Sequence, residues 1–189
     1  MRIAISGLSG CGNSTVTKLV GEKLGLTVIN FSFKQLAQEK GLSEEEIQVL
    51  AERDPRFDFE LDERNLNSAL ENEGIVWGNR LSAWFLSKTG KADLVVWLEA
   101  SLKERERRIE ERAKLTGKKQ VSAEVRDGKN ARRYIKLYRI DVGDIRLKKD
   151  GGIFDLVIDS ERLSPEEIAE IIVKKARELL AEKAKGKKH

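Results

Sequence analysis

The sequence predicts a three-layer α/β fold, in which helices cover both faces of a parallel, five-stranded sheet. Five short apolar runs have the continuous hydrophobic character of strands that are buried on both faces, and they lie at residues 2–6, 27–31, 75–77, 94–98 and 154–159. Stretches with helical periodicity separate these runs. Such an alternation of strands and helices is typical of a parallel sheet.

The length and composition of the chain limit the class of protein. Its 189 residues suit one α/β domain, and 40% of them are hydrophobic, which is enough for a core. No apolar run approaches the roughly 20 residues that a membrane span needs, and the first strand begins so early that we expect no signal peptide. We therefore expect a cytoplasmic protein with no membrane partner.

Cysteine and histidine are too scarce for several kinds of site. Cys11 is the only cysteine and His189 is the only histidine, which argues against a disulfide framework, a zinc cluster and a histidine base. Charged residues make up 36% of the chain, a bias that is typical of thermophilic proteins. The net charge of +4 is small, and we expect no nucleic-acid partner.

The first strand leads into a glycine-rich loop, "GLSGCGNST", at residues 7–15. Gly7, Gly10 and Gly12 allow a tight turn and a close approach of the backbone to an anion. Apolar residues recur at helical spacing after the loop, and Gly25 is a typical residue to end that helix. The helix would direct the positive end of its dipole at a phosphate, so strand, loop and helix together predict a nucleotide site.

One position of the loop departs from the usual pattern G-x-x-x-x-G-K-[ST]. Asn13 takes the place of the lysine, whose charge normally reaches the β- and γ-phosphates. The hydroxyl of Ser14 or Thr15 can still reach a Mg²⁺ ion. Two interpretations remain open: a working site whose charge comes from elsewhere, and a loop that binds nucleotide with little catalysis.

Arginines later in the chain are candidates for the missing charge. The spacing of Arg105, Arg108 and Arg112 places them on one helix face. Residues 114–150 are more polar and rich in lysine, arginine and glycine, which indicates an inserted, mobile lid. The arginines of this lid that we consider are Arg126, Arg132 and Arg133.

A competing interpretation pairs these arginines with neighbouring glutamates on a solvated helix. For Arg107 we favour that interpretation. For the lid arginines we favour a functional role, because phosphoryl transfer depends on positioning and charge neutralisation.

Three later helices have their starts marked in the sequence. Boxes of the form S-x-x-E begin at Ser43, Ser101 and Ser164, where the serine and glutamate side chains can bond each other's backbone N–H groups. Pro165 follows the last serine at the first helical position, where a proline is well tolerated.

Over residues 1 to about 180 the chain resembles the archaeal cytidylate kinases, which belong to the P-loop nucleoside monophosphate kinases. The stretches "FDFELDERN" and "IVWGNRLSAW" are similar to two blocks of that family, and "RDGKNARRYIKLYRIDVGDI" is similar to its lid. The matching positions are Asp62, Arg64, Arg80, Leu81, Trp84, Arg105, Arg108, Ile109, Arg112, Arg126, Arg133, Tyr134, Tyr138, Asp141 and Asp144. Archaeal members often lack the loop lysine, so Asn13 is a modest change within the family.

The resemblance implies an ATP-dependent, Mg²⁺-assisted transfer of a phosphoryl group to CMP or dCMP, in a P-loop kinase fold with an inserted helical lid. Ser14 would hold the Mg²⁺ ion. The donor phosphates would lie on Gly7, Leu8, Ser9, Gly10, Cys11, Gly12, Asn13, Ser14 and Thr15. The acceptor would be bound by Lys34, Asp62, Arg64 and Arg80, and the catalytic charge would come from Arg126, Arg133 and Arg80.

Three departures from the family lie on the acceptor side. Lys34 in "SFKQLA" stands where the family has an arginine, and the segment before it is about two residues short. Gly78 and Asn79 replace a glutamate and a glycine before Arg80, which removes a carboxylate from the site. A diverged paralogue with another acceptor therefore stays open, as does a nucleotide-binding protein with little catalysis; an RNA-associated protein is a weaker alternative.

These observations divide the chain into a single kinase domain and a tail. The domain spans residues 1–180, with an acceptor-binding helical region at 31–73 and the lid at 114–150. The tail at 181–189 is basic, and we expect it to be disordered. We expect a monomer.

Overall fold

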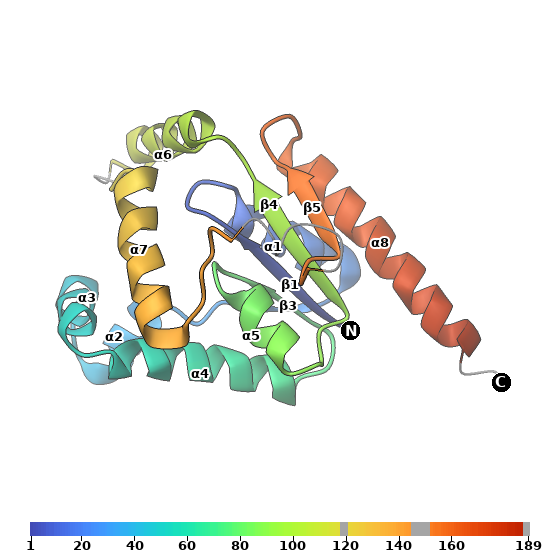
Figure 1. Ribbon diagram of the computed structural model, residues 1–189, viewed down its shortest axis with the longest axis horizontal. Helices are drawn as coiled ribbons and strands as arrows, with labels where there is room; N and C mark the ends of the chain where they lie inside the picture. The colour runs from blue at the N-terminus through green and yellow to red at the C-terminus, as the bar shows by residue number, and fades with distance from the viewer. Residues whose placement is uncertain (118–120, 145–151, 187–189) are drawn as a thin grey trace.

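The computed structural model describes residues 1–117, 121–144 and 152–186, and its strands form one parallel sheet in the order β2-β3-β1-β4-β5 (Figure 1). The strands are β1 (Arg2–Gly7), β2 (Thr27–Ile29), β3 (Ile75–Gly78), β4 (Leu94–Glu99) and β5 (Leu156–Asp159). The predicted five-stranded parallel sheet is confirmed. Strand β1 lies at its centre, so the loop that follows β1 emerges in the middle of the sheet edge.

Helices cover both faces of this sheet. They are α1 (Asn13–Leu24), α2 (Phe33–Lys40), α3 (Glu44–Arg53), α4 (Arg56–Glu71), α5 (Ser82–Lys88), α6 (Leu102–Thr116), α7 (Ala123–Tyr138) and α8 (Pro165–Gly186). The core consists of two main clusters, one on each face of the sheet, and alternate residues of β1 belong to different clusters because neighbouring side chains of a strand point to opposite faces. Ile3 and Ile5 pack with α1 and α8, whereas Ala4 belongs to the cluster formed with α4 and α5. None of the described helices is long and apolar enough to cross a bilayer.

The predicted helix boundaries agree with the local hydrogen bonds. The Ser43, Ser101 and Ser164 hydroxyls each accept a hydrogen bond from the backbone N–H three residues later. Gly25 ends α1 in the left-handed conformation, with φ of 64°. These caps fix where three helices begin and where α1 ends.

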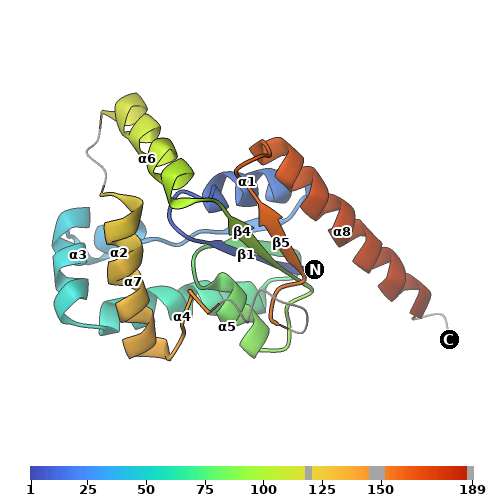
Figure 2. The same cartoon turned by 45° about the horizontal axis from the view of Figure 1, so that its top comes forward.

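The predicted lid and acceptor region lie beyond the carboxyl ends of the strands. Helix α6 rises from the end of β4, and α7 runs from it toward α4 (Figure 2). Helices α2 and α3 form a small core of their own around Leu36, Ala37 and Ile47. Parts of the expected lid, residues 118–120 and 145–150, lie outside the described residues.

The expectation of a disordered tail from residue 181 is wrong for its first six residues. Helix α8 continues to Gly186, because "AEKAKG" consists mainly of alanine, lysine and glutamate, which are strong helix formers. Lys183 also forms an ion pair with Asp93, the residue just before β4. The Asp93 carboxylate accepts a second hydrogen bond, of 2.6 Å, from the backbone N–H of Arg2. Residues 187–189 of the expected tail lie outside the described part of the chain.

Candidate active site

The glycine loop between β1 and α1 has the backbone conformation of an anion site. Gly10 and Gly12 have φ of 87° and 96°, a region that favours glycine. A Cβ atom on Gly10 would also come within 2.8 Å of the Arg105 carbonyl oxygen, so the loop packs closely on α6. Helix α1 begins directly after Gly12, and its first N–H groups lack intrahelical partners. The loop therefore presents a positive helix terminus to the cavity in front of it.

Asn13, at the position of the usual lysine, bonds to the loop itself. Its Nδ2 donates a hydrogen bond of 2.7 Å to the carbonyl oxygen of Gly7, where β1 ends. A Cβ atom on Gly7 would lie 2.6 Å from the Asn13 Oδ1, so the asparagine occupies space that a side chain at residue 7 would need. Asn13 thus ties the start of α1 to the end of β1 and contributes no charge.

A cavity of about 630 Å³ lies in front of the loop. Every loop residue from 8 to 15 lines it, whereas Gly7 ends β1 behind them. The exposed Ser14 stands in the first turn of α1, where its hydroxyl could ligate a cation. We call this cavity in front of the loop the donor cavity. The arginines that line it are Arg80, Arg107, Arg108, Arg112 and Arg126. Loop and arginines together suit a polyanion such as the triphosphate of a nucleotide.

Two of the arginines on α6 are fixed by neighbouring groups. Arg108 donates to the Ser160 carbonyl oxygen at 2.6 Å and to Glu104 at 2.8 Å. Arg107 pairs with Glu104 and Glu111, which confirms the ion-pair interpretation for this residue. Hydrogen bonds from Arg107, and then from Arg108, hold the pKa of Glu104 at about 2.

A second cavity, of about 870 Å³, lies between α7 and the α2–α4 region. We call it the acceptor cavity, and it carries several basic side chains, among them Lys129, Arg132, Arg133 and Lys136. Arg80 and Arg126 line both this cavity and the donor cavity. These two guanidinium groups therefore mark the place where the two cavities meet.

Arg80 and Arg126 are close enough to affect each other. Burial lowers the pKa of Arg126, and the charge of Arg80 lowers it further. Arg80 donates from Nη2 to the Ser9 hydroxyl at 2.9 Å, while its Nε is buried and makes no hydrogen bond within the described residues. Two guanidinium groups at one junction would attract an anionic group between them.

Arg133 was predicted to act together with Arg126, but it does not line both cavities as Arg126 does. Its guanidinium forms an ion pair with Asp58 on α4 and donates to the Ala51 carbonyl oxygen at 2.9 Å. Arg133 lines the acceptor cavity but not the donor cavity. Its contact with the transferring phosphoryl group therefore stays a prediction. Asp58 was not among the predicted site residues, although its spacing of four from Asp62 places both on one face of α4.

The other predicted acceptor residues do not line the acceptor cavity. Lys34 is exposed on α2, and Arg64 pairs with Glu39 and Glu60 at the surface. Asp62 accepts a 2.7 Å hydrogen bond from the Tyr138 hydroxyl, and burial raises its pKa to about 6. None of Lys34, Asp62 and Arg64 is among the described residues that line the acceptor cavity, in contrast to Arg80.

The missing carboxylate at residue 78 has a steric cause. A Cβ atom on Gly78 would overlap the hydroxyl of Thr17 and lie 2.7 Å from the Thr17 Cβ. Thr17 on α1 is 2% exposed, and its hydroxyl has no hydrogen-bond partner among the described residues. The threonine therefore fills the place of a side chain at residue 78.

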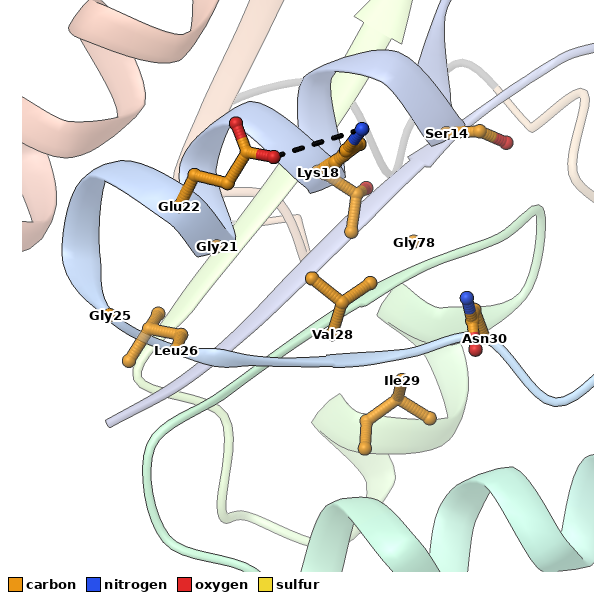
Figure 3. A pocket seen from close by; sticks show the side chains of 11 residues that line it. Ser14, Lys18, Gly21, Glu22, Gly25, Leu26, Val28, Ile29, Asn30 and Gly78 are labelled. Atoms are coloured by element: carbon orange, nitrogen blue, oxygen red, sulfur yellow. Dashed lines mark ion pairs between the residues drawn. The ribbon is translucent and has the colours of Figure 1, made fainter.

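A third cavity, of about 590 Å³, lies beside this contact, between α1 and β2 (Figure 3). Lys18 and Glu22 on α1, and Val28 on the edge strand, are part of its lining. Ser14 and Gly78 line both this cavity and the donor cavity. Gly78, which packs against Thr17, thus lies where this third cavity adjoins the donor cavity.

Comparison with solved structures supports the fold. The chain superposes on a shikimate kinase from Acinetobacter baumannii with a TM-score of 0.60 and 16% identity, covering 94% of this chain and 93% of that one. It superposes on a deoxyadenosine kinase from M. mycoides with a TM-score of 0.54 and 21% identity, covering 94% and 100%. At this level of identity the likeness concerns the fold.

Comparison of sequences places the chain more closely. It is 38% identical over 180 residues to a cytidylate kinase from Archaeoglobus fulgidus, covering 92% of this chain and 93% of that protein. It is 39% identical over 177 residues to one from Methanospirillum hungatei, with coverage of 91% and 94%. It is 35% identical over 173 residues to one from Pyrococcus horikoshii, with coverage of 90% and 85%. A model of the cytidylate kinase-like family matches residues 2–162, and the chain belongs to this family.

Proposed function

We propose that the protein transfers the terminal phosphoryl group of ATP to CMP or dCMP. The observation that carries this proposal is the pair of cavities that meet at Arg80 and Arg126, one of them built on a phosphate loop. The family supports the acceptor, because the relatives that match over most of their length are cytidylate kinases.

The loop and α1 would bind the donor phosphates through backbone N–H groups and the helix dipole. A Mg²⁺ ion, ligated by Ser14 and the donor, would neutralise charge on the β- and γ-phosphates. The hydroxyl in the first turn of α1 and the open cavity beside it fit such an ion. Asn13 would keep the loop in shape through its bond to Gly7.

Arg80 and Arg126 would stabilise the charge that spreads over the transferring group. They lie where donor and acceptor cavities join, so they can contact the phosphoryl group and the attacking oxygen together. A phosphate oxygen of the acceptor is already ionised at neutral pH, and no general base is required.

The test is the formation of ADP from ATP and Mg²⁺ with each of CMP, dCMP, UMP, AMP, GMP and shikimate. We expect CMP and dCMP to have the highest kcat/KM and Arg80→Ala to abolish the reaction with both. A faster reaction with another acceptor would replace CMP in this proposal. ATP binding without acceptor-dependent ADP formation would indicate a nucleotide-binding protein.

A second candidate, a kinase of the same fold with a different acceptor, is favoured by a specific observation. Lys34, Asp62 and Arg64 do not line the acceptor cavity, and Gly78 carries no carboxylate. The acceptor panel distinguishes the two candidates directly.

A further inference from the structure

Ser9 in the phosphate loop is held by three side chains from distant parts of the sequence. Its backbone N–H donates to Asp127 Oδ1 at 3.1 Å, and its carbonyl oxygen accepts from Arg105 Nη1 at 3.1 Å. Its hydroxyl accepts from Arg80 Nη2 at 2.9 Å. Ser9 is 5% exposed, so these contacts are shielded from solvent.

Asp127 uses both of its carboxylate oxygens in this arrangement. Oδ2 forms an ion pair with Arg105 on α6, while Oδ1 accepts from the loop. The side chains of Arg105 and Asp127 are 8% and 15% exposed. A buried, charge-assisted pair of this kind has strict geometry, because each group loses its hydration and depends on the other. One carboxylate thus connects α6, α7 and the phosphate loop.

The residue before Asp127 is Arg126, which lies at the junction of the two cavities. The charges of Arg80 and Arg112 both oppose the charged form of Arg126, whereas Asp127 favours it. Because these cations repel one another, contacts that fix the start of α7 oppose the separation of Arg126 from Arg80. The hydrogen bond from the Ser9 N–H to Asp127, the residue next to Arg126, is such a contact.

We propose that Asp127 is a positioning residue for phosphoryl transfer, which clamps the start of α7 to the phosphate loop and thereby places Arg126 at the cavity junction. The role in transfer rests on the proposed function, whereas the clamp itself does not. Because the clamp engages the Ser9 N–H, that group is not available to a donor phosphate, and Asp127 acts through Arg126 without touching substrate.

The first experiment is hydrogen–deuterium exchange of the chain without nucleotide. Asp127→Ala removes both the hydrogen bond from the Ser9 N–H and the ion pair with Arg105. Asp127→Asn keeps an oxygen for the Ser9 N–H but loses the ion pair. We expect faster exchange in residues 7–12 and at the start of α7, with a larger effect for alanine than for asparagine. Glu124→Gln, which removes an exposed carboxylate from the first turn of α7, is the matched control and should exchange as the wild type does.

The second experiment is steady-state kinetics with ATP and CMP. Asp127→Asn should lower kcat by about 10²-fold, the order expected when a catalytic group is slightly misplaced, with a much smaller change in the KM of ATP. Asp127→Glu should recover part of the loss. In an Arg126→Ala background the Asp127→Asn change should cause no further loss of kcat, because Asp127 acts through Arg126.

The outcomes separate the clamp from the reaction. Unchanged exchange in both Asp127 variants overturns the clamp, and additive losses of kcat in the double variant overturn its action through Arg126. If Asp127→Ala does not fold by circular dichroism, Asp127→Asn decides both questions. If the wild type transfers no phosphate to any acceptor, the proposed function and the positioning role both fail, while the exchange still tests the clamp.

Discussion

Asn13 shows how one side chain can replace a lysine without replacing its charge. In the structure its amide is directed at the Gly7 carbonyl oxygen, so it stabilises the loop, and the arginines around the donor cavity supply the positive charge. A residue with this role should tolerate neutral replacements and reject an anion.

We therefore expect Asn13→Asp to lower kcat/KM for ATP by at least about 10²-fold, because a carboxylate would repel both the Gly7 carbonyl oxygen and the donor phosphates. Asn13→Thr should stay within about tenfold of the wild type. Asn13→Lys should also give no large gain, since a new cation would compete with Arg80 and Arg126. Steady-state phosphoryl transfer measures all three, and a gain of about 10²-fold for lysine would contradict the relocation of charge.

At the scale of elements, α1 and β3 are fitted to each other through Thr17 and Gly78. Gly78→Ala should lower the free energy of unfolding by about 1–3 kcal/mol, the usual cost of overpacking. Thr17→Ala removes the overlapping hydroxyl, so the double variant should be more stable than the sum of the single changes predicts. Urea unfolding of the four proteins measures this coupling.

Gly128→Ala is the control for that experiment. Gly128 lies within α7, and a Cβ atom there would meet nothing within 4 Å, so alanine should stabilise the helix by about 0.5–1 kcal/mol. Strict additivity between residues 17 and 78 would show that the two elements adjust independently.

Two of the lid arginines on α7 have different surroundings, because Arg126 lines both cavities and Arg133 lines only the acceptor cavity, and their substitutions should differ. Arg126→Ala should lower kcat by about 10³-fold with a smaller change in the KM of ATP, because it meets charge that develops during transfer. Arg133→Ala should mainly raise the KM of the acceptor, since Arg133 holds Asp58 and Ala51 beside the acceptor cavity. Kinetics with both substrates varied measures each constant.

Arg162→Ala provides the control for a lost surface arginine, since that side chain is 88% exposed. The kcat of Arg162→Ala and its KM values for ATP and for the acceptor should match those of the wild type. Identical changes in Arg126→Ala and Arg133→Ala would mean that the helix responds as one unit to the loss of either charge.

At the scale of the whole molecule, Asp62 should make stability depend on pH. Burial raises its folded-state pKa from 3.8 to about 6, so folding favours the protonated form. The contribution of protonated Asp62 to the free energy of unfolding is fully present below pH 3.8 and is lost as the pH rises through about 6. Asp62→Asn keeps an oxygen for the Tyr138 hydroxyl and carries no ionisable proton.

The free energy of unfolding of Asp62→Asn should therefore rise relative to that of the wild type between about pH 4 and pH 8. We expect the relative change to reach about 1–3 kcal/mol. Urea unfolding at several pH values measures the difference. Glu63→Gln, at the exposed neighbouring position, should leave the pH profile unchanged. A constant difference between Asp62→Asn and wild type across this range would contradict the raised pKa.

Most of the fold could be predicted from the sequence, because strands buried on both faces and capped helices leave local signals. The run at residues 27–31 was too long: β2 ends at Ile29, since it lies at the sheet edge and pairs only with β3. The helical end of α8 was not predicted, because a basic composition is typical of frayed ends, whereas lysine and alanine also favour helix.

The site was predictable where it depends on the backbone and not where it depends on side chains from distant segments. The phosphate loop follows from the order of strand, glycines and helix, and its residues 8–15 line one cavity. The donor role of that cavity stays a prediction, and Arg126 is predicted from the polar composition of the lid segment and from the family resemblance. The pairs Thr17 with Gly78, Asp58 with Arg133 and Ser9 with Asp127 join residues far apart in the chain, and no local pattern specifies them. For Asp127, its place beside Arg126 was the one available signal.

Asp93 has a practical consequence for engineering. Its carboxylate accepts a hydrogen bond from the backbone N–H of Arg2 and forms an ion pair with Lys183, so β1 and the last turns of α8 are connected at the amino-end edge of the sheet. The donor and acceptor cavities open at the opposite edge, where the strands end. A linker could therefore run from the end of α8 to the start of β1, and new termini could be opened at an exposed surface turn, such as that around Gly90, away from these cavities. A circular permutant of this design would keep every residue of the phosphate loop and of α7 in one uninterrupted chain.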